Sequence, residues 1–154
     1  MSIEKNVQTV KDFFAAMGRG DKQGLLALCA DDIEWIIPGK DWPLAGTHRG
    51  HSGLEGLLQK TSEMEISSPR PPEYVAQGDR VLLVGFAKGK VKATNKAFED
   101  DWVFAITVRN GKLTNIREYS TRRHWRGPPR WVRAWGSPPK KLVEQGWSVR
   151  ALHR

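Results

Sequence analysis

The sequence predicts an α+β domain in which helices cover one face of a curved antiparallel or mixed sheet. Two observations lead to this fold class. Apolar residues recur at helical spacing in three segments before residue 62, and strand-like runs separated by turn signals fill residues 74–119. Helices that precede a meander of strands pack together on one face of the sheet. A length of 154 residues supports one domain with a modest core.

Two helices are expected at the start of the chain. The first covers residues 3–17 and ends at Gly18 or Gly20, because its apolar residues follow the helical repeat. Asp21 then has the side chain of a good N-cap for a second, short helix. The apolar positions of the two helices are Val7, Val10, Phe13, Phe14 and Met17 in the first, and Leu25, Leu26 and Leu28 in the second.

A strand and a third helix are expected next. Residues 30–39 alternate and stop at a Pro-Gly pair, which is typical of a strand in which Trp35 and Ile37 share one face. Residues 40–50 are expected to form a loop. Ser52 is expected to start the third helix, since Glu55 follows three residues later in a capping-box position. The proline-rich segment 67–73 ends that helix.

The rest of the domain is expected to be a strand meander. Runs at residues 74–77 and 80–91 flank a Gly-Asp turn, and runs at 97–109 and 112–119 flank Asn110-Gly111, a strong two-residue hairpin signal. Residues 1–120 therefore form the predicted domain, and residues 121–154 follow it as a separate basic tail.

Composition bounds the cellular setting. The chain has one cysteine, Cys29, which cannot form an internal disulfide and fits a reducing cytoplasm. The N-terminus lacks the features of a signal peptide, and no apolar run approaches 18 residues. We therefore expect a cytoplasmic protein without a membrane span, with Cys29 as a buried structural thiol.

The net charge lies entirely in the tail. Residues 1–120 hold sixteen basic and sixteen acidic side chains, whereas residues 121–154 hold nine basic side chains and one acidic side chain, Glu144. Arginines alternate there with Trp125, Trp131 and Trp135, a composition that could neutralise phosphates and stack on unpaired bases. Nucleic-acid binding through the tail is one interpretation.

A change of reading frame near Ser120 is the other interpretation of the tail. Density of Arg, Trp, Pro and Gly is typical of a GC-rich gene read out of frame. If the gene is read from the third base of the Ser120 codon, the last base of the His124 codon and the first two bases of the Trp125 codon form a leucine codon. Codon choices through Pro129 then allow Asp-Thr-Pro-Ala-Leu-Ala-Arg-Ala-Ala. We hypothesise that the frame changed at this point.

Three segments carry a resemblance to a known family. They read VKDFFAAMGRGDKQGLLALCADDIEWIIPG, AGTHRGHSGLEGLL and DDWVFAITVRNGKLTNIREY. Together they resemble the SnoaL-like branch of the superfamily that includes ketosteroid isomerase and nuclear transport factor 2, over residues 5–120. The resemblance implies a cone-shaped α+β fold, three N-terminal helices on the concave face of the sheet, an apolar pocket, frequent homodimers, and no metal or organic cofactor. It implies no single activity.

Glu118 is the favoured catalytic or ligand-orienting carboxylate. In the resembling family the acid of an -REY- segment often faces the cavity, and Ile116, Glu118 and Ser120 share one face by alternation. The alternative is that Glu118 pairs with a basic residue on a neighbouring strand. Ile37 occupies the position of the ketosteroid isomerase base, and isoleucine cannot take a proton, so this departure argues against steroid isomerisation.

The wall of the pocket is expected to be aromatic and apolar. Plain core packing is the alternative for these residues, and the acidic triplet at residues 99–101 is expected to be a solvated edge. Trp42 is expected in a flap over the pocket mouth. The predicted wall consists of Trp35, Ile37, Trp42, Phe86, Trp102 and Phe104.

His51 is the second candidate for the chemistry. It lies near a helix N-terminus, where the dipole disfavours the charged imidazole, so a neutral ring could serve as a base or donor. A surface or structural histidine is the alternative. His48 and His51 have no third ligand nearby, so no metal site is expected.

These observations predict a protein that binds a small apolar ligand. The predicted chemistry is isomerisation, cyclisation or hydrolysis of an apolar carbonyl or polycyclic metabolite by carboxylate general acid/base catalysis, without a cofactor. The alternatives are a non-catalytic ligand-binding or dimerisation module, a homodimer in either case, and nucleic-acid binding through the tail.

Overall fold

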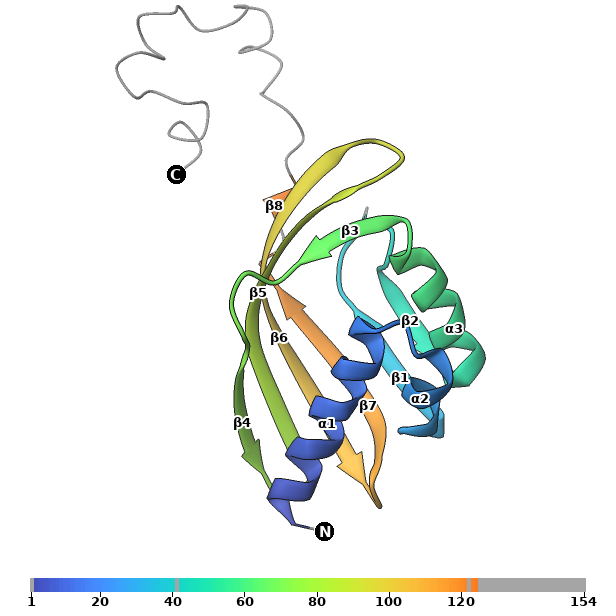
Figure 1. The fold of residues 1–154 in the computed structure, drawn as a ribbon, viewed down its shortest axis with the longest axis vertical. Coiled ribbons are helices and arrows are strands. Elements are labelled where there is room, and N and C mark those ends of the chain that lie inside the picture. Colours follow the sequence, from blue (N-terminus) through green and yellow to red (C-terminus); the bar gives the residue numbers. More distant parts are fainter. Residues whose placement is uncertain (1, 41, 122, 125–154) are drawn as a thin grey trace, which may run out of the picture. The chain divides into compact units, whose positions relative to one another are not determined.

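The computed structural model describes residues 2–40, 42–121 and 123–124, and the tail interpretations therefore fall almost wholly outside the described residues. Three helices lie within residues 3–61, and strands make up most of residues 64–121 (Figure 1). The helices are α1 (Ile3–Gly18), α2 (Lys22–Ala27) and α3 (Gly50–Thr61). The strands are β1 (Cys29–Ile37), β2 (Gly46–Arg49), β3 (Met64–Ser67), β4 (Glu73–Gln77), β5 (Arg80–Val91), β6 (Lys96–Arg109), β7 (Lys112–Ser120) and β8 (Arg123–His124).

The strands form one curled, mixed sheet. Its order is β2-β1-β7-β6-β5-β3, and β4 also pairs with β5. The pairs in this order, and the pair of β4 with β5, are antiparallel except for β1 and β7, which run parallel. The chain between β1 and β7 is long enough for such a parallel pair, which a tight turn cannot connect. The predicted α+β class with a mixed curved sheet is confirmed.

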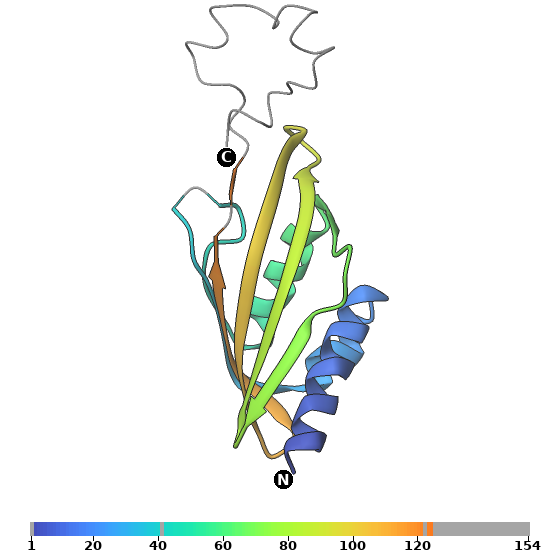
Figure 2. The same ribbon diagram turned by 90° about the vertical axis from the view of Figure 1, so that its left-hand side faces the viewer.

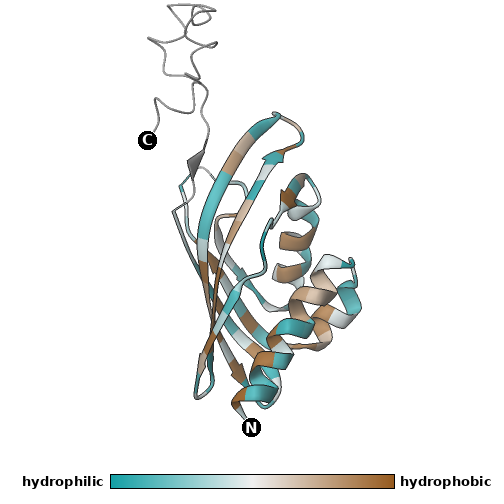
Figure 3. Cartoon of the chain, turned by 60° about the vertical axis from the view of Figure 1, so that its left-hand side comes forward, coloured by the Kyte–Doolittle hydropathy of each residue, from teal (hydrophilic) through white to brown (hydrophobic). Residues whose placement is uncertain are grey.

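The helices lie on one side of this sheet (Figure 2). Helix α1 contacts β4, β5 and β7, while α3 contacts β1 and β2. The inner side of α1 buries Val10, Phe13 and Ala16 completely, as the predicted helical repeat requires. Figure 3 shows apolar segments on the helices and on the strands that face them. The core therefore lies between α1 and the concave face of the sheet.

Two of the three helix starts follow the capping rules. The Ser2 hydroxyl accepts a hydrogen bond from the Lys5 amide at 3.2 Å, and the Asp21 carboxylate accepts one from the Gly24 amide at 2.9 Å. The start of α3 was predicted wrongly. It begins at Gly50 rather than Ser52, with Arg49 as an N-cap that makes no side-chain hydrogen bond. Strand β2 runs directly into this helix, and Gly50 turns the chain with a φ of 67°.

Two short strands were also missing from the prediction. The expected loop at residues 40–50 contains β2, which pairs with β1 and places His48 beside Trp35. Strand β3 follows α3 and pairs with the far end of β5. Both have four residues, so their hydrogen bonds come from a neighbouring strand rather than from a recognisable periodicity.

In the described part of the chain, no helix combines the length and apolarity needed to cross a membrane.

Candidate functional site

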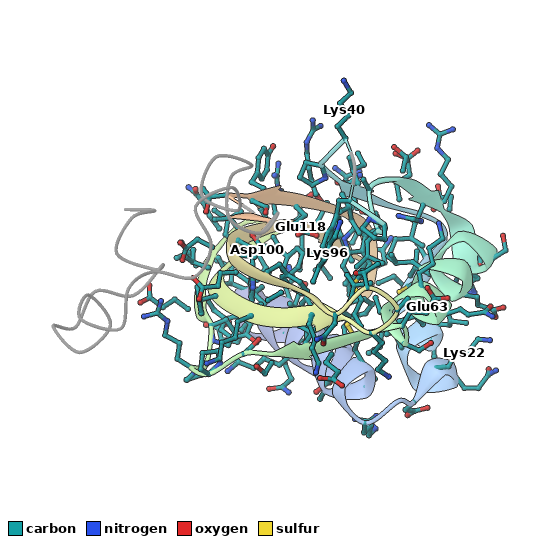
Figure 4. All side chains as sticks on the ribbon, turned by 90° about the horizontal axis from the view of Figure 1, so that it is seen from above. Lys22, Lys40, Glu63, Lys96, Asp100 and Glu118 are labelled. Carbon is teal, nitrogen blue, oxygen red and sulfur yellow. The ribbon has the colours of Figure 1, made fainter. Side chains whose placement is uncertain are left out.

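The concave face of the three central strands brings the predicted acid and two predicted wall residues together. Register places Glu118 of β7 opposite Phe104 of β6, and Ser120 opposite Trp102. Residues paired in this way present their side chains on the same face. Glu118 is only 8% exposed, and Figure 4 shows it on the inner side of the curved sheet.

Aromatic rings fill the concave face beside Glu118. Phe104 lies at the centre, with ring centroids 4.6 Å from Trp102, 5.6 Å from Phe14 and 5.9 Å from Trp35. Phe13 extends this cluster, 5.2 Å from Phe14 and 5.9 Å from Trp35. Trp102 and Phe104 remain partly exposed, so the aromatic cluster reaches solvent at these two residues.

Trp35 contributes a polar atom to this apolar cluster. Its side chain is 5% exposed, and its indole Nε1 is fully buried with no hydrogen-bond partner within the described residues. Buried indole N–H groups usually find an acceptor. Trp35 of β1 pairs with Ile116 of β7. Ile116 comes two residues before Glu118, so both lie on the same face of β7.

Asp100 is a second buried acid on the same face, and the prediction of a wholly solvated acidic triplet is wrong for it. Asp100 is 5% exposed, whereas Glu99 and Asp101 are exposed. The Ser120 hydroxyl donates a hydrogen bond to its carboxylate. Figure 4 shows Asp100 and Glu118 both within the curve of the sheet. Strict alternation along β6, applied from Trp102, was the signal that could have identified Asp100.

The loop between β1 and β2 covers the adjacent part of the face. Trp42 is 7% exposed and packs edge-on against Phe98 with ring centroids 5.0 Å apart. Phe98 lies two residues before Asp100 on the same side of β6. Ile37, at the end of β1, is also buried. Trp42 and Ile37 are thus packed in the core beside the concave face, and neither lines an open pocket mouth.

Two predicted site residues lie elsewhere. Phe86 pairs with Asp101 and therefore faces the convex side, where the guanidinium of Arg70 lies 5.3 Å from its ring centroid. His51 lies on α3, with Nε2 3.1 Å from the Cys29 carbonyl oxygen and 3.8 Å from the Asp31 carboxylate. These contacts attach α3 to the start of β1, and they separate His51 from the aromatic cluster.

Two hollows of the described residues are lined by residues outside the aromatic cluster. One of about 480 Å³ lies between α2 and α3 and is lined by Lys22, Ser52, Glu55, Gly56, Leu58 and Gln59. A small one of about 30 Å³ adjoins Phe86 and residues 99–101.

The family profile that matches this chain is the SnoaL-like domain, over residues 10–116. The chain belongs to the SnoaL-like family. The curled mixed sheet with helices on its concave face agrees with this membership, as do the similar solved structures described as NTF2-like and cystatin-like.

Several solved structures and a curated relative resemble this SnoaL-like chain. An NTF2-like protein from Burkholderia xenovorans is 74% identical, with a TM-score of 0.75, over 78% of this chain and 92% of that one. TerC, crystallised with polyporic acid, is 26% identical, with a TM-score of 0.62, over 75% and 90%. The uncharacterised protein Rv0034 of Mycobacterium tuberculosis is 25% identical over 77% of this chain and 91% of its own length.

The described residues provide no obvious metal centre. No three side chains of His, Cys, Asp or Glu within residues 2–40, 42–121 and 123–124 gather closely enough to hold an ion. The polar groups of the concave face include the carboxyl groups of Asp100 and Glu118, the Ser120 hydroxyl and the Trp35 indole N–H. Such a set can accept, donate and transfer protons.

Proposed function

We propose that this SnoaL-like domain binds a small apolar ring compound on its concave face, with Glu118 as the carboxylate that orients the compound or exchanges a proton with it. The observation that supports this most directly is the position of Glu118, 8% exposed and paired with Phe104 at the centre of the aromatic cluster. A buried carboxyl group beside aromatic rings suits a group that orients a ligand or exchanges a proton with it.

The surrounding groups suit a ring that carries a carbonyl or hydroxyl group. Aromatic walls bind flat apolar rings, and a few convergent polar groups orient them. The Trp35 N–H could donate a hydrogen bond to a ligand oxygen. Glu118 would accept a hydrogen bond from an adjacent ligand atom or remove a proton from it. TerC, at 26% identity, was crystallised with polyporic acid, which supports a small-molecule ligand for this fold.

The chemistry that follows is proton transfer next to a carbonyl group. Glu118 would remove a proton from the carbon beside the carbonyl, and the electron pair would move onto the carbonyl oxygen. A donor such as the Trp35 N–H stabilises the negative oxygen that forms. Return of the proton to a different atom completes an isomerisation without a cofactor.

The test is hydrogen–deuterium exchange into 2-tetralone, a two-ring ketone, followed by proton NMR in D₂O. The native protein is expected to accelerate exchange beside the carbonyl, and Glu118→Gln to reduce the acceleration by about 10²-fold or more. Asp101→Asn is the matched control, because Asp101 is an exposed acid of β6 on the opposite face. Full acceleration by the Glu118→Gln protein would remove Glu118 from this role.

We also propose that the convex face pairs two copies of the chain. Figure 2 shows the helices on the other side of the sheet. Val84, Val103 and Tyr119 form one row across β5, β6 and β7, and Val84 is 42% and Tyr119 53% exposed. Val75 of β4 adds a side chain that is 57% exposed. Contiguous apolar surface on a sheet is typical of a protein–protein interface.

Sedimentation velocity tests this dimer. The native protein is expected to sediment as a dimer and Val84→Asp as a monomer, because the new carboxylate would be buried without a partner. Ile66→Asp is the control, since Ile66 is similarly exposed at 49% but lies on β3, opposite Gly89 and away from the Val84 row. A dimeric Val84→Asp protein would rule out this face.

A further inference from the structure

The indole of Trp102 leans toward one neighbouring strand. Trp102 of β6 is paired on one side with Gly85 of β5 and on the other with Ser120 of β7. A Cβ atom built at Gly85 would lie 2.3 Å from Cζ2 and 2.4 Å from Cη2 of the indole. The six-membered ring therefore lies over the backbone of Gly85, on the side away from β7.

Gly85 is required by space rather than by backbone conformation. The glycines with positive φ are at other positions, so the backbone of residue 85 suits any residue. Real Cβ atoms do not approach other heavy atoms to 2.3 Å, so a side chain here would have to displace the indole. The atoms that it meets are at the far end of the Trp102 side chain, which can rotate more cheaply than the backbone can shift.

The direction of that displacement matters for the site. Trp102 lies between Asp100 and Phe104 on the inner face of β6, and Phe104 already packs against it at 4.6 Å. A ring pushed off Gly85 would move toward β7, where Ser120 and Glu118 lie. The glycine thus leaves room for the partly exposed indole on the β5 side, away from β7 and Glu118.

We propose that Gly85 and Trp102 together determine which ligands reach Glu118. The inference rests on the proposed function. With the indole seated on Gly85, a flat ring compound with a hydroxyl or carbonyl group enters between the indole and β7, with its polar group toward Glu118. A side chain at position 85 closes this space, and a smaller side chain at position 102 widens it.

A crystal structure of Gly85→Ala tests the first step. The indole is expected to leave residue 85 and to lie over Ser120. Gly56→Ala is the matched control, since a Cβ atom added at Gly56 would meet no neighbouring heavy atom within 4 Å, and Trp102 is expected to keep its native place in it. An indole that stays over residue 85 in the Gly85→Ala protein, with a shifted backbone, would overturn the inference.

Binding of 2-naphthol, followed by its fluorescence, tests the second step. Gly85→Ala is expected to weaken binding by about tenfold or more, as one added methyl group can in a fitted pocket. Gly85→Ala combined with Trp102→Leu is expected to restore the Kd to within a few-fold of the native value. Because the two residues are in contact, their effects on stability are not expected to add. Urea denaturation of the same variants therefore separates a change of affinity from a loss of folded protein.

The outcomes separate this inference from the proposed function. The role of the Gly85–Trp102 pair would be overturned if Gly85→Ala bound 2-naphthol as tightly as the native protein does. It would also be overturned if adding Trp102→Leu did not restore the Kd. Either result would count even if the native protein accelerates 2-tetralone exchange. Absence of 2-naphthol binding by the native protein would contradict this site as well. A further outcome is that the native protein does not accelerate 2-tetralone exchange while the variants show the expected pattern of 2-naphthol binding. That result would remove the catalytic role of Glu118 and keep the Gly85–Trp102 pair as a determinant of binding.

Discussion

At the scale of single residues, alternation along one strand separates a buried acid on the concave face from two exposed acids on the convex face. Asp100 points to the concave face and is 5% exposed, while Glu99 and Asp101 on either side are exposed. Asp100 accepts a hydrogen bond from Ser120, which partly offsets the cost of burying it. Three consecutive acidic residues thus belong to two different surfaces, and only the middle one lies on the concave face that also carries Glu118 and the aromatic cluster.

Cys29 shows the opposite case of a reactive group made inert by its position. Burial raises the pKa of its thiol from 9.0 to about 12, and its Sγ contacts the Leu25 carbonyl oxygen at 3.4 Å. Because the folded-state pKa is raised, the stabilisation from the neutral thiol is present below 9.0 and is lost as the pH rises through about 12.

We therefore expect Cys29 to resist Ellman's reagent in the native protein at ~pH 8, because the thiolate is the reactive form. The same protein unfolded in guanidinium should release about one equivalent of thionitrobenzoate per chain, from its single cysteine. Rapid labelling of the native protein would show that the thiol is accessible.

At the scale of elements, the hairpin between β6 and β7 fixes the register that brings Glu118 opposite Phe104. The turn residues Asn110 and Gly111 have φ angles of 52° and 74°. Asn-Gly is the sequence that best tolerates two positive φ angles in a two-residue loop, which is why this hairpin could be predicted.

Gly111→Ala is expected to lower the free energy of unfolding by about 1 kcal/mol, because an L-residue is strained at a positive φ. Urea denaturation followed by circular dichroism measures it. Gly56→Ala in the middle of α3 serves as the reference, since its Cβ meets nothing within 4 Å and alanine favours a helix. Equal stability of Gly111→Ala and the native protein would contradict the turn geometry.

Elements with a strong internal pattern could be predicted, and elements defined by a partner could not. The helical repeat around Phe13 and the alternation of Trp35 with Ile37 required no knowledge of the rest of the chain. Strand β2 exists because β1 offers it hydrogen bonds, and Gly50 starts α3 because that strand ends there. Phe86 was misplaced within the site for the same reason, since only pairing with Asp101 shows which face it occupies.

At the scale of the whole molecule, the net charge changes shortly after the part of the chain that matches the SnoaL-like family, residues 10–116. The first 120 residues are neutral, and the remainder carries a net charge of +8. The Burkholderia xenovorans protein is 74% identical yet covers 78% of this chain and 92% of its own. The SnoaL-like profile matches residues 10–116, so the match to the family ends shortly before Ser120. This supports our proposal of a frame change near Ser120. Resequencing the gene tests it, and close relatives encoding the same Arg- and Trp-rich tail in frame would overturn it.

Whatever its origin, the tail is expected to dominate any interaction with nucleic acid. Its nine Lys and Arg side chains can neutralise phosphates, whereas residues 1–120 have no net charge to attract them. In a gel-shift assay with a single-stranded oligonucleotide, six or more phosphate contacts predict a loss of affinity of about 10³-fold between ~50 and ~200 mM salt. A chain that ends at Ser120 should not shift the oligonucleotide at either salt concentration. Binding by this shortened chain, or binding by the full chain that is insensitive to salt, would instead place a nucleic-acid site on the SnoaL-like domain itself.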